Sequence, residues 1–339
     1  MNTLPAKARN LSAAPRRAVL VFCFVLAVCA LSPAANRAQP PAFEYRGTCD
    51  ASAAVTIGGE HFIVANDEDN DLRVYRFGAP EPVAVIGLSE FAGAGADDPE
   101  LDIEAAARIG TRVYWITSHG ANRKGKYRPA RRRLFATDIT FKDDIPTIRP
   151  VGRASDDLFE VMSASDRLKR YGLAHAAEIA PKEDGGLNIE GLAATPGGAL
   201  LIGFRNPIPG GKALVVTLTN PAEVIRGAKP AIGAVRELPL GGLGIRAMER
   251  RGDHYLVVAG PPGDGGTFRL FRWRGPSKRS APAPLSGVDF EGMNPEALFV
   301  APDGKVHILS DDGTRNMGGV ECKNSPRENR RFRATVITP

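Results

Sequence analysis

Residues 188–203 read NIEGLAATPGGALLIG, and this stretch decides the fold. Apolar residues lie on both sides of a Pro-Gly-Gly segment, which is the pattern of two β-strands joined by a tight turn. The same pattern of strand, glycine turn and strand recurs four more times along the chain. The five copies begin at residues 50, 102, 188, 244 and 294.

Most copies are spaced by about 50 residues, a period typical of β-propellers built from short strands. Each pair is followed by a third strand candidate, at 71–77, 132–139, 213–218, 267–273 and 331–337. Fourth candidates follow at 83–87, 147–151 and 235–240, with a weak, proline-rich one at 281–286. The sequence therefore predicts an all-β fold, a five-bladed β-propeller that forms one domain over residues 42–339.

The spacing between the second and third copies is longer than the others, and residues 155–172 make up the surplus. They read SDDLFEVMSASDRLKRYG. Ser155 is a candidate N-cap, and Leu158, Val161, Met162 and Leu168 are spaced as on one face of a helix. The surplus therefore predicts a short helical insertion that leaves the outer edge of the second blade.

The fifth copy lacks a fourth strand, and residues 43–47 can supply it from the other end of the chain. Cys49 and Cys322 lie next to these two ends. Two cysteines in an oxidising compartment are usually paired, so we expect a Cys49–Cys322 disulfide that closes the ring. The alternative is a pair of buried free thiols.

Residues 1–38 have the order of a secretory signal peptide. A basic stretch ends at Arg16-Arg17, an apolar run spans 18–31, and small and polar residues follow. The apolar run is shorter than the roughly 20 residues of a membrane span, although an uncleaved anchor is the alternative. We expect a monomeric periplasmic or secreted protein with no membrane span after cleavage.

The charge distribution excludes a nucleic-acid partner. The formal net charge is +6, but residues 1–38 hold five basic residues and no acidic one. A protein that binds a polyanion should keep its basic surplus in the folded part of the chain.

Polar residues recur at two matched places in the repeats. Near the start of each first strand stand Ser52, Glu104, Glu190, Arg246 and Glu296. Directly after the second strands stand Asn66-Asp67-Glu68, Ser118-His119, Arg205-Asn206 and Ser310-Asp311-Asp312. In a propeller both places lie on one face, so we expect these residues to surround a shared axial pocket.

Three matched glutamates near one axis repel each other unless a cation compensates them or their pKa values rise. One interpretation is a Ca²⁺ site formed by Glu104, Glu190, Glu296 and Asp311, because hard cations prefer oxygen ligands. The alternatives are compensation by Arg205 and Arg246, and glutamates that cap backbone N–H groups of a neighbouring blade.

The repeat motifs resemble a family of exported bacterial proteins catalogued as domain of unknown function 3616. The resemblance is carried by Asp102-Ile103-Glu104-Ala105-Ala106, Glu190-Gly191-Leu192, Gly203-Phe204-Arg205-Asn206-Pro207, Gly244-Ile245-Arg246 and Asn294-Pro295-Glu296-Ala297-Leu298. It covers roughly residues 48–337 and implies a propeller-like fold without an assigned activity. The Asp/Asn-x-Glu-Gly-Leu unit is more distantly similar to phytase-like esterase propellers and calcium-dependent lactonase propellers.

Two functional hypotheses follow. In the first, the protein is a cation-assisted hydrolase of a small ester, lactone or phosphoester, in which the predicted metal ligands act with His119 as general base. Arg205 and Arg246 would then bind an anionic group of this small-molecule substrate. In the second, the same face belongs to a non-catalytic periplasmic binding or scaffold propeller.

Overall fold

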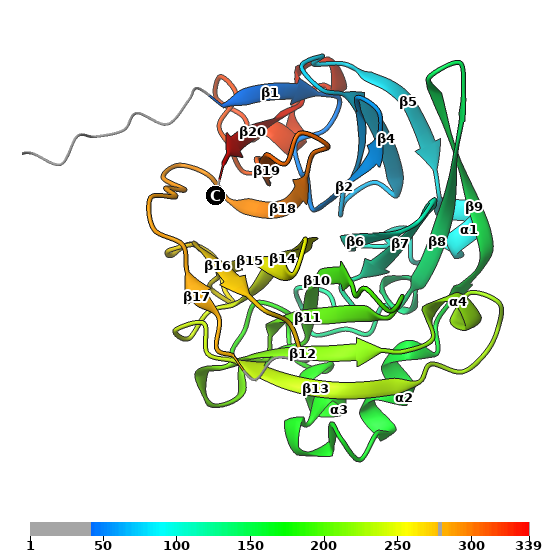
Figure 1. Ribbon diagram of the computed structural model, residues 1–339, viewed down its shortest axis with the longest axis vertical. Helices are drawn as coiled ribbons and strands as arrows, with labels where there is room; N and C mark the ends of the chain where they lie inside the picture. The colour runs from blue at the N-terminus through cyan, green and yellow to red at the C-terminus, as the bar shows by residue number, and fades with distance from the viewer. Residues whose placement is uncertain (1–41, 277–279, 339) are drawn as a thin grey trace, which may run out of the picture. The chain divides into compact units, whose positions relative to one another are not determined.

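Residues 42–276 and 280–338 are described by a computed structural model of the protein. They form a five-bladed β-propeller of five four-stranded antiparallel sheets, as predicted (Figure 1). The predicted signal peptide lies outside the described residues. In the described part of the chain, no helix is long and apolar enough to cross a membrane.

The strands of each blade follow one another outward from the axis. Blade 1 contains β2 (Ala53–Gly58), β3 (His61–Ala65), β4 (Asp71–Arg76) and β5 (Pro82–Gly87). Blade 2 contains β6 (Ile103–Ile109), β7 (Arg112–Thr117), β8 (Leu134–Lys142) and β9 (Ile145–Ser155). Blade 3 contains β10 (Asn188–Ala194), β11 (Leu200–Asn206), β12 (Ala213–Leu218) and β13 (Ile232–Leu238).

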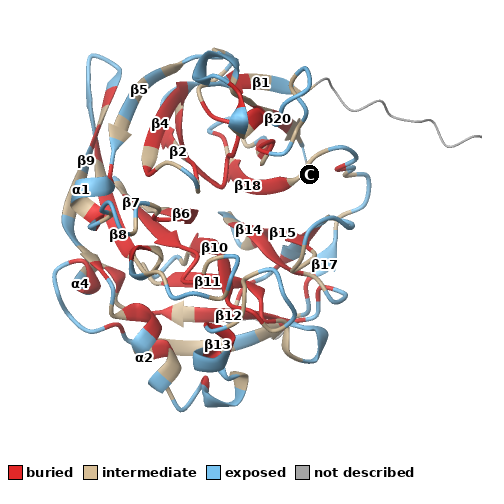
Figure 2. Cartoon of the chain, turned by 180° about the vertical axis from the view of Figure 1, so that it is seen from behind, coloured by how far each residue is buried: buried red, intermediate tan, exposed pale blue. Residues whose placement is uncertain are grey.

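Blade 4 contains β14 (Gly244–Arg251), β15 (His254–Gly260), β16 (Arg269–Trp273) and the two-residue β17 (Ala283–Pro284). Blade 5 combines β18 (Pro295–Val300), β19 (Val306–Ser310) and β20 (Arg331–Ile337) with β1 (Phe43–Arg46) from the other end of the described chain. Each inner strand contacts the next, and β18 meets β2, so the ring is closed. The inner strands are mostly buried, whereas the outer ones are largely exposed (Figure 2).

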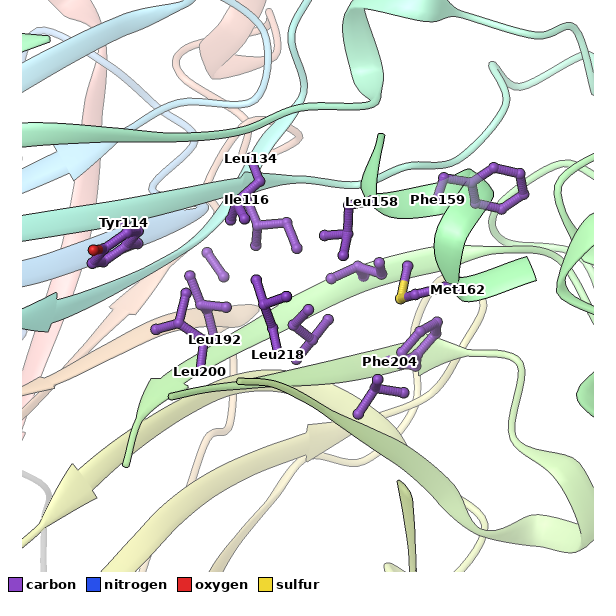
Figure 3. Packing of buried hydrophobic residues seen from close by; sticks show 14 of the residues in the cluster. Tyr114, Ile116, Leu134, Leu158, Phe159, Met162, Leu192, Leu200, Phe204 and Leu218 are labelled. Atoms are coloured by element: carbon purple, nitrogen blue, oxygen red, sulfur yellow. The ribbon is translucent and has the colours of Figure 1, made fainter. Parts of the chain in front are cut away.

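The hydrophobic core is divided among the contacts between neighbouring blades. The largest cluster joins blades 2 and 3 and includes Leu134, Leu192 and Phe204 (Figure 3). The insertion after β9 packs against it through Leu158 and Met162 of α2 (Leu158–Ala164). Each blade therefore buries its apolar faces against its neighbours, which explains why both strands of every repeat are apolar.

The helical insertion is confirmed, with a different start. Ser155 does not cap the helix, because it pairs with Leu134 and so is the last residue of β9. After α2 the insertion continues through a 3₁₀ turn, η2 (Lys169–Tyr171), and α3 (Leu173–Ala176). The remaining short helices are α1 (Ser89–Ala92), α4 (Pro221–Val224) and the 3₁₀ turns η1 (Pro129–Arg131), η3 (Pro209–Gly211), η4 (Cys322–Asn324) and η5 (Arg327–Asn329).

The predicted closure of the ring is confirmed in both of its parts. β1 pairs with β20 along its whole length, from Phe43 opposite Ala334 to Arg46 opposite Arg331. Cys49 and Cys322 form a disulfide with a Cα–Cα distance of 5.9 Å. First and last strands thus share one blade, and the bridge joins the segments beside them.

Candidate functional site

The matched polar residues of the inner strands meet at the axis. Ser52, Glu104, Glu190 and Glu296 line one small cavity there, together with alanine, leucine and methionine side chains of the same strands. The space open to the centre of a water molecule is about 10 Å³, which is room for about one water. The shared axial pocket was expected from the repeats, and its small size was not.

A β-bulge positions the three glutamates, and it positions Arg246 of β14 in the same way. The pairing of the inner strand with its neighbour skips one residue at Glu104 in β6, Glu190 in β10, Arg246 in β14 and Glu296 in β18. A bulge leaves one residue outside the ladder and changes the direction of its side chain. The four ionisable residues are therefore placed by the same local distortion in four different blades.

Arg246 and Arg205 neutralise two of the three glutamates. Arg246, of which 2% is exposed, forms ion pairs with Glu296 and, from Nε at 3.2 Å, with Glu190 Oε2. Arg205 Nη1 donates to Glu190 Oε1 at 2.8 Å. Burial and the neighbouring Arg205 lower the pKa of Arg246 to about 10, so it stays protonated at neutral pH.

Asparagines and carbonyl groups complete this network. Asn294 donates from Nδ2 to Glu296 Oε1 at 3.2 Å, and Asn188 donates to Glu190 Oε1 at 2.8 Å. The remaining N–H groups of Arg205 donate to the carbonyl oxygens of Pro261 and Gly263. The arginines thus meet anionic and neutral oxygen partners inside the protein, which corresponds to the internal compensation considered from the sequence.

Glu104 is different from the other two glutamates. Only 7% of it is exposed, and it makes no hydrogen bond or ion pair with any residue of the described chain. Burial, together with the nearby carboxylates of Glu190, Asp102 and Asp67, raises its pKa well above the ordinary value. Glu104 is therefore a buried carboxyl group that lines the axial cavity without a partner.

Three aspartates continue the negative charge from Glu104 toward blades 5 and 1. Asp67 Oδ1 is shielded from solvent and has no hydrogen-bond partner in the described chain. Asp67 lies close enough to Asp102 and Asp311 for their charges, together with its burial, to raise its pKa. We call Asp50, Asp67, Glu104 and Asp311 the acidic mouth.

Asp50 lies beside Asp311 within the acidic mouth. Burial, together with the nearby Asp67 and Asp311, raises the pKa of Asp50 to about 10. Asp311 accepts from Asn294 Nδ2 at 3.0 Å and from the Gly313 N–H at 2.8 Å. No Lys or Arg of the described chain forms an ion pair with any of the four acids of the mouth.

His119 lies outside the lining of the axial cavity and is completely buried. Its Nδ1 hydrogen-bonds to the Thr117 carbonyl oxygen at 2.9 Å, and its Nε2 has no partner in the described chain. Burial is the main cause that lowers the pKa of His119 to about 4. The neutral ring has a free acceptor nitrogen, and its role as general base stays a prediction.

The predicted metal ligands are thus divided between two environments. Glu190 and Glu296 face arginines, whereas Glu104 and Asp311 belong to the acidic mouth. Across residues 42–276 and 280–338, no group of three or more His, Cys, Asp or Glu side chains is arranged so that it could hold a metal ion.

Asp50 was not expected as a site residue. It opens the first repeat at the position that Asp102, Asn188 and Asn294 occupy in the others, and that match could have identified it. Asp67 was expected at the axial pocket, but not as an unpaired acid. The shielding of its Oδ1 was not readable, because the run Asp67-Glu68-Asp69 has the composition of a solvated turn.

Comparison with families of known sequence supports the resemblance. The model of a family described as "Protein of unknown function (DUF3616)" matches residues 150–293. No protein with a curated description matches the chain.

The solved structures that match this chain include a cyclase, a dehydrogenase and a GH43 protein, all at low sequence identity. A glutaminyl cyclase of Myxococcus xanthus is 13% identical, with a TM-score of 0.42 over 87% of this chain and 96% of the cyclase. A putative glucose dehydrogenase of Thermus thermophilus is 12% identical, with a TM-score of 0.44 over 87% of this chain and 100% of the other. A GH43B protein of Bacteroides ovatus is 13% identical, with a TM-score of 0.46 over 87% of this chain and 54% of its own.

Proposed function

We propose that this chain is an exported propeller that binds a small ligand through a positively charged group at its acidic mouth. The observation that supports this is the pair Glu104, only 7% exposed, and Asp67, whose Oδ1 is shielded from solvent, because neither carboxyl group forms an ion pair within the described chain. Buried charges in proteins are normally paired or bind ions, so these groups must carry protons or meet a cation.

The raised pKa of Asp50, about 10, gives the mouth a way to accept that cation. When a cation arrives, the Asp50 proton can leave and its carboxylate becomes available. Export agrees with this function, because the disulfide suits an oxidising compartment and residues 1–38 have the order of a signal peptide.

Two chemical sources could supply the positive charge, a divalent metal ion and an organic ammonium group. The mouth offers only oxygen atoms, but its acids are not arranged as a metal site in the described chain, so the geometry favours the ammonium group and CaCl₂ serves as the comparison. Glu104, Asp67, Asp50 and Asp311 would face the ammonium group, and Glu190 and Glu296 would stay with their arginines.

Calorimetric titration of the oxidised protein with CaCl₂ and, separately, with putrescine tests the proposal. We expect one of the two to bind, and the Asp67→Asn variant to lose at least about tenfold in affinity, because one charge pair is removed. The matched control is Asp166→Asn, since Asp166 is exposed and pairs with Lys169 at the surface. Binding of neither probe, or equal binding by Asp67→Asn, would contradict the proposal.

Hydrolysis at the same place is a second candidate function. It is favoured by the position of Glu104, a carboxyl group with a raised pKa beside a cavity with room for about one water. p-Nitrophenyl acetate and p-nitrophenyl phosphate, each with and without CaCl₂, serve as probes. Turnover by the wild type that is lost in Glu104→Gln would support hydrolysis. Loss of turnover in the separate variant His119→Asn would assign the general base to His119. Absence of turnover would overturn this candidate.

A further inference from the structure

On both sides of the disulfide, a backbone hydrogen bond reaches the segment 311–313, which contains Asp311 of the acidic mouth. Cys49 directly precedes Asp50, and the Cys49 carbonyl oxygen accepts the N–H of Asp312 at 2.9 Å. On the other side, Lys323 directly follows Cys322, and its N–H donates to the Gly313 carbonyl oxygen at 3.1 Å. The bridge therefore holds the segment 311–313 from two sides.

Because Gly313 has no side chain, the Asp50 carboxyl group can occupy the space beside it. A Cβ atom on Gly313 would lie 1.8 Å from Asp50 Oδ1 and 3.1 Å from Asp311 Oδ1. No side chain can fit at that distance, so Asp50 reaches Asp311 only because residue 313 is glycine. The same glycine N–H donates to Asp311 Oδ1, which sets the orientation of the second carboxyl group.

Apart from the bridge, the loop between Asp311 and Cys322 is anchored mainly through Asp312 and Arg315. Arg333 Nε donates to Asp312 Oδ2 at 2.8 Å and Arg315 Nη1 to Glu44 Oε1 at 2.7 Å, but most residues from 314 to 321 are not buried. Asp50 and Asp311 come from opposite ends of the described chain, and the two cysteines beside them are 273 residues apart in sequence. Without the bridge, nothing covalent keeps these two carboxyl groups together.

We infer that the Cys49–Cys322 disulfide and Gly313 are positioning elements of the acidic mouth, so that the cation site is complete only in the oxidised chain. This inference rests on the proposed cation-binding function. Closure of the bridge removes two electrons and two protons from the two thiols. A disulfide oxidant such as oxidised glutathione takes them up and leaves as two thiols. A chain still in a reducing compartment would therefore not bind the cation, and the exported chain would.

The test compares the oxidised protein with Cys49→Ala/Cys322→Ala and with Gly313→Ala. Far-UV circular dichroism checks that each variant keeps its strands, and hydrogen exchange measures protection of residues 311–325. We expect faster exchange there in the double variant and at least about a tenfold loss of CaCl₂ or putrescine affinity in both. Gly197→Ala is the control, because Gly197 has open space around it and lies in a hairpin turn.

The outcomes separate this inference from the proposed function. If the folded double variant and Gly313→Ala bind the probe as tightly as the oxidised protein, the inference is wrong and the cation site stands. If the oxidised protein binds neither probe, the proposed function is wrong. Unchanged hydrogen exchange at 311–325 in the double variant would then also overturn the positioning role.

Discussion

Glu104, Glu190, Arg246 and Glu296 occupy equivalent bulges in four blades, yet they have different electrostatic partners. Glu190 and Glu296 share the charge of Arg246, and Glu104 in the neighbouring blade has no cation paired with it in the described chain. The identity of the residue at one repeated position, acidic in three blades and basic in one, therefore decides which carboxylates are neutralised and which remain available.

Replacement of Arg246 by methionine tests the ion pairs that neutralise Glu190 and Glu296. We expect Arg246→Met to lower the free energy of unfolding by about 3–5 kcal/mol, because Glu190 and Glu296 would lose a buried counter-charge. Urea denaturation at pH 7 measures this loss. Arg226→Met removes an exposed ion pair with Glu223 and should cost less than about 1 kcal/mol. An equally small effect at Arg246 would show that the network does not stabilise the fold.

Replacement of Glu104 by glutamine tests the carboxyl group that has no ion pair. Unlike Arg246→Met, this variant should raise the free energy of unfolding. The pKa of Glu104 is raised in the folded protein, so the charged form destabilises the fold as the pH rises above the ordinary value of 4.5. Glu104→Gln should therefore be more stable than the wild type at pH 8 and within about 0.5 kcal/mol of it at pH 4. A variant less stable at pH 8 would mean that Glu104 has a stabilising partner.

His119 predicts a pH dependence at the acid end. Its folded-state pKa of about 4 lies below the ordinary 6.5, so the unfolded chain binds the extra proton between these values. Stability from this group is present above pH 6.5 and is lost as the pH falls toward 4, by about 3 kcal/mol. His119→Asn should lack this loss relative to the wild type, and asparagine tolerates the positive φ of 58° at this position. Parallel denaturation curves at pH 7 and 4.5 provide the comparison.

Much of the candidate site was predictable from the sequence, because matched positions of the repeats occupy equivalent places in their blades. Glu104, Glu190 and Glu296 were expected at one pocket and line one cavity. Their partners were not predictable, since ion pairs such as Arg205–Glu190 and the isolation of Glu104 depend on side-chain distances across blades. Asp50 was missed for the same reason, because its burial arises only when the ring closes.

At the scale of elements, β1 links two blades although it is only four residues long. Its Tyr45 is 3% exposed, packs edge-on against Phe62 and Tyr75, and stacks on Phe332 at 5.4 Å. One strand of four residues thus joins the hydrophobic contacts of blades 5 and 1.

Tyr45→Ala should lower the free energy of unfolding by about 3–5 kcal/mol, the usual cost of removing a buried aromatic ring. Phe43→Ala on the same strand is the control, because Phe43 is 38% exposed and should cost about 1 kcal/mol or less. Thermal and urea unfolding of the two variants compare them. Equal effects would mean that β1 does not contribute to the core of the closing blade.

The predicted strand bounds agree with the structure where the repeat is regular. They are less accurate where pairing with a neighbouring strand lengthens a strand. β9 runs from Ile145 to Ser155, well beyond the predicted 147–151, because β8 provides partners along a long hairpin. The weak fourth strand of blade 4 is real but is reduced to Ala283–Pro284, since proline cannot donate to the ladder.

At the scale of the molecule, closure of the ring also brings together the acids of the candidate site. Asp311 follows β19 of blade 5, Asp50 lies between β1 of blade 5 and β2 of blade 1, and Asp67 and Glu104 come from blades 1 and 2. The acidic mouth therefore forms only when blades 5, 1 and 2 have come together. Asp50, with its pKa raised to about 10 by burial and by the nearby Asp67, is protonated at pH 7 in the absence of a cation.

Proton release on binding is the most direct test of this account. Titrations of the oxidised protein at pH 7 with CaCl₂ and with putrescine are run in two buffers of different ionisation enthalpy, which gives the number of protons exchanged. We predict that the cation that binds releases about one proton or more, because a nearby positive charge lowers the pKa values of the mouth carboxyl groups. Asp67→Asn should abolish or strongly reduce both binding and release. Binding without proton release, or equal release in Asp67→Asn, would contradict the claim that these carboxyl groups form the site.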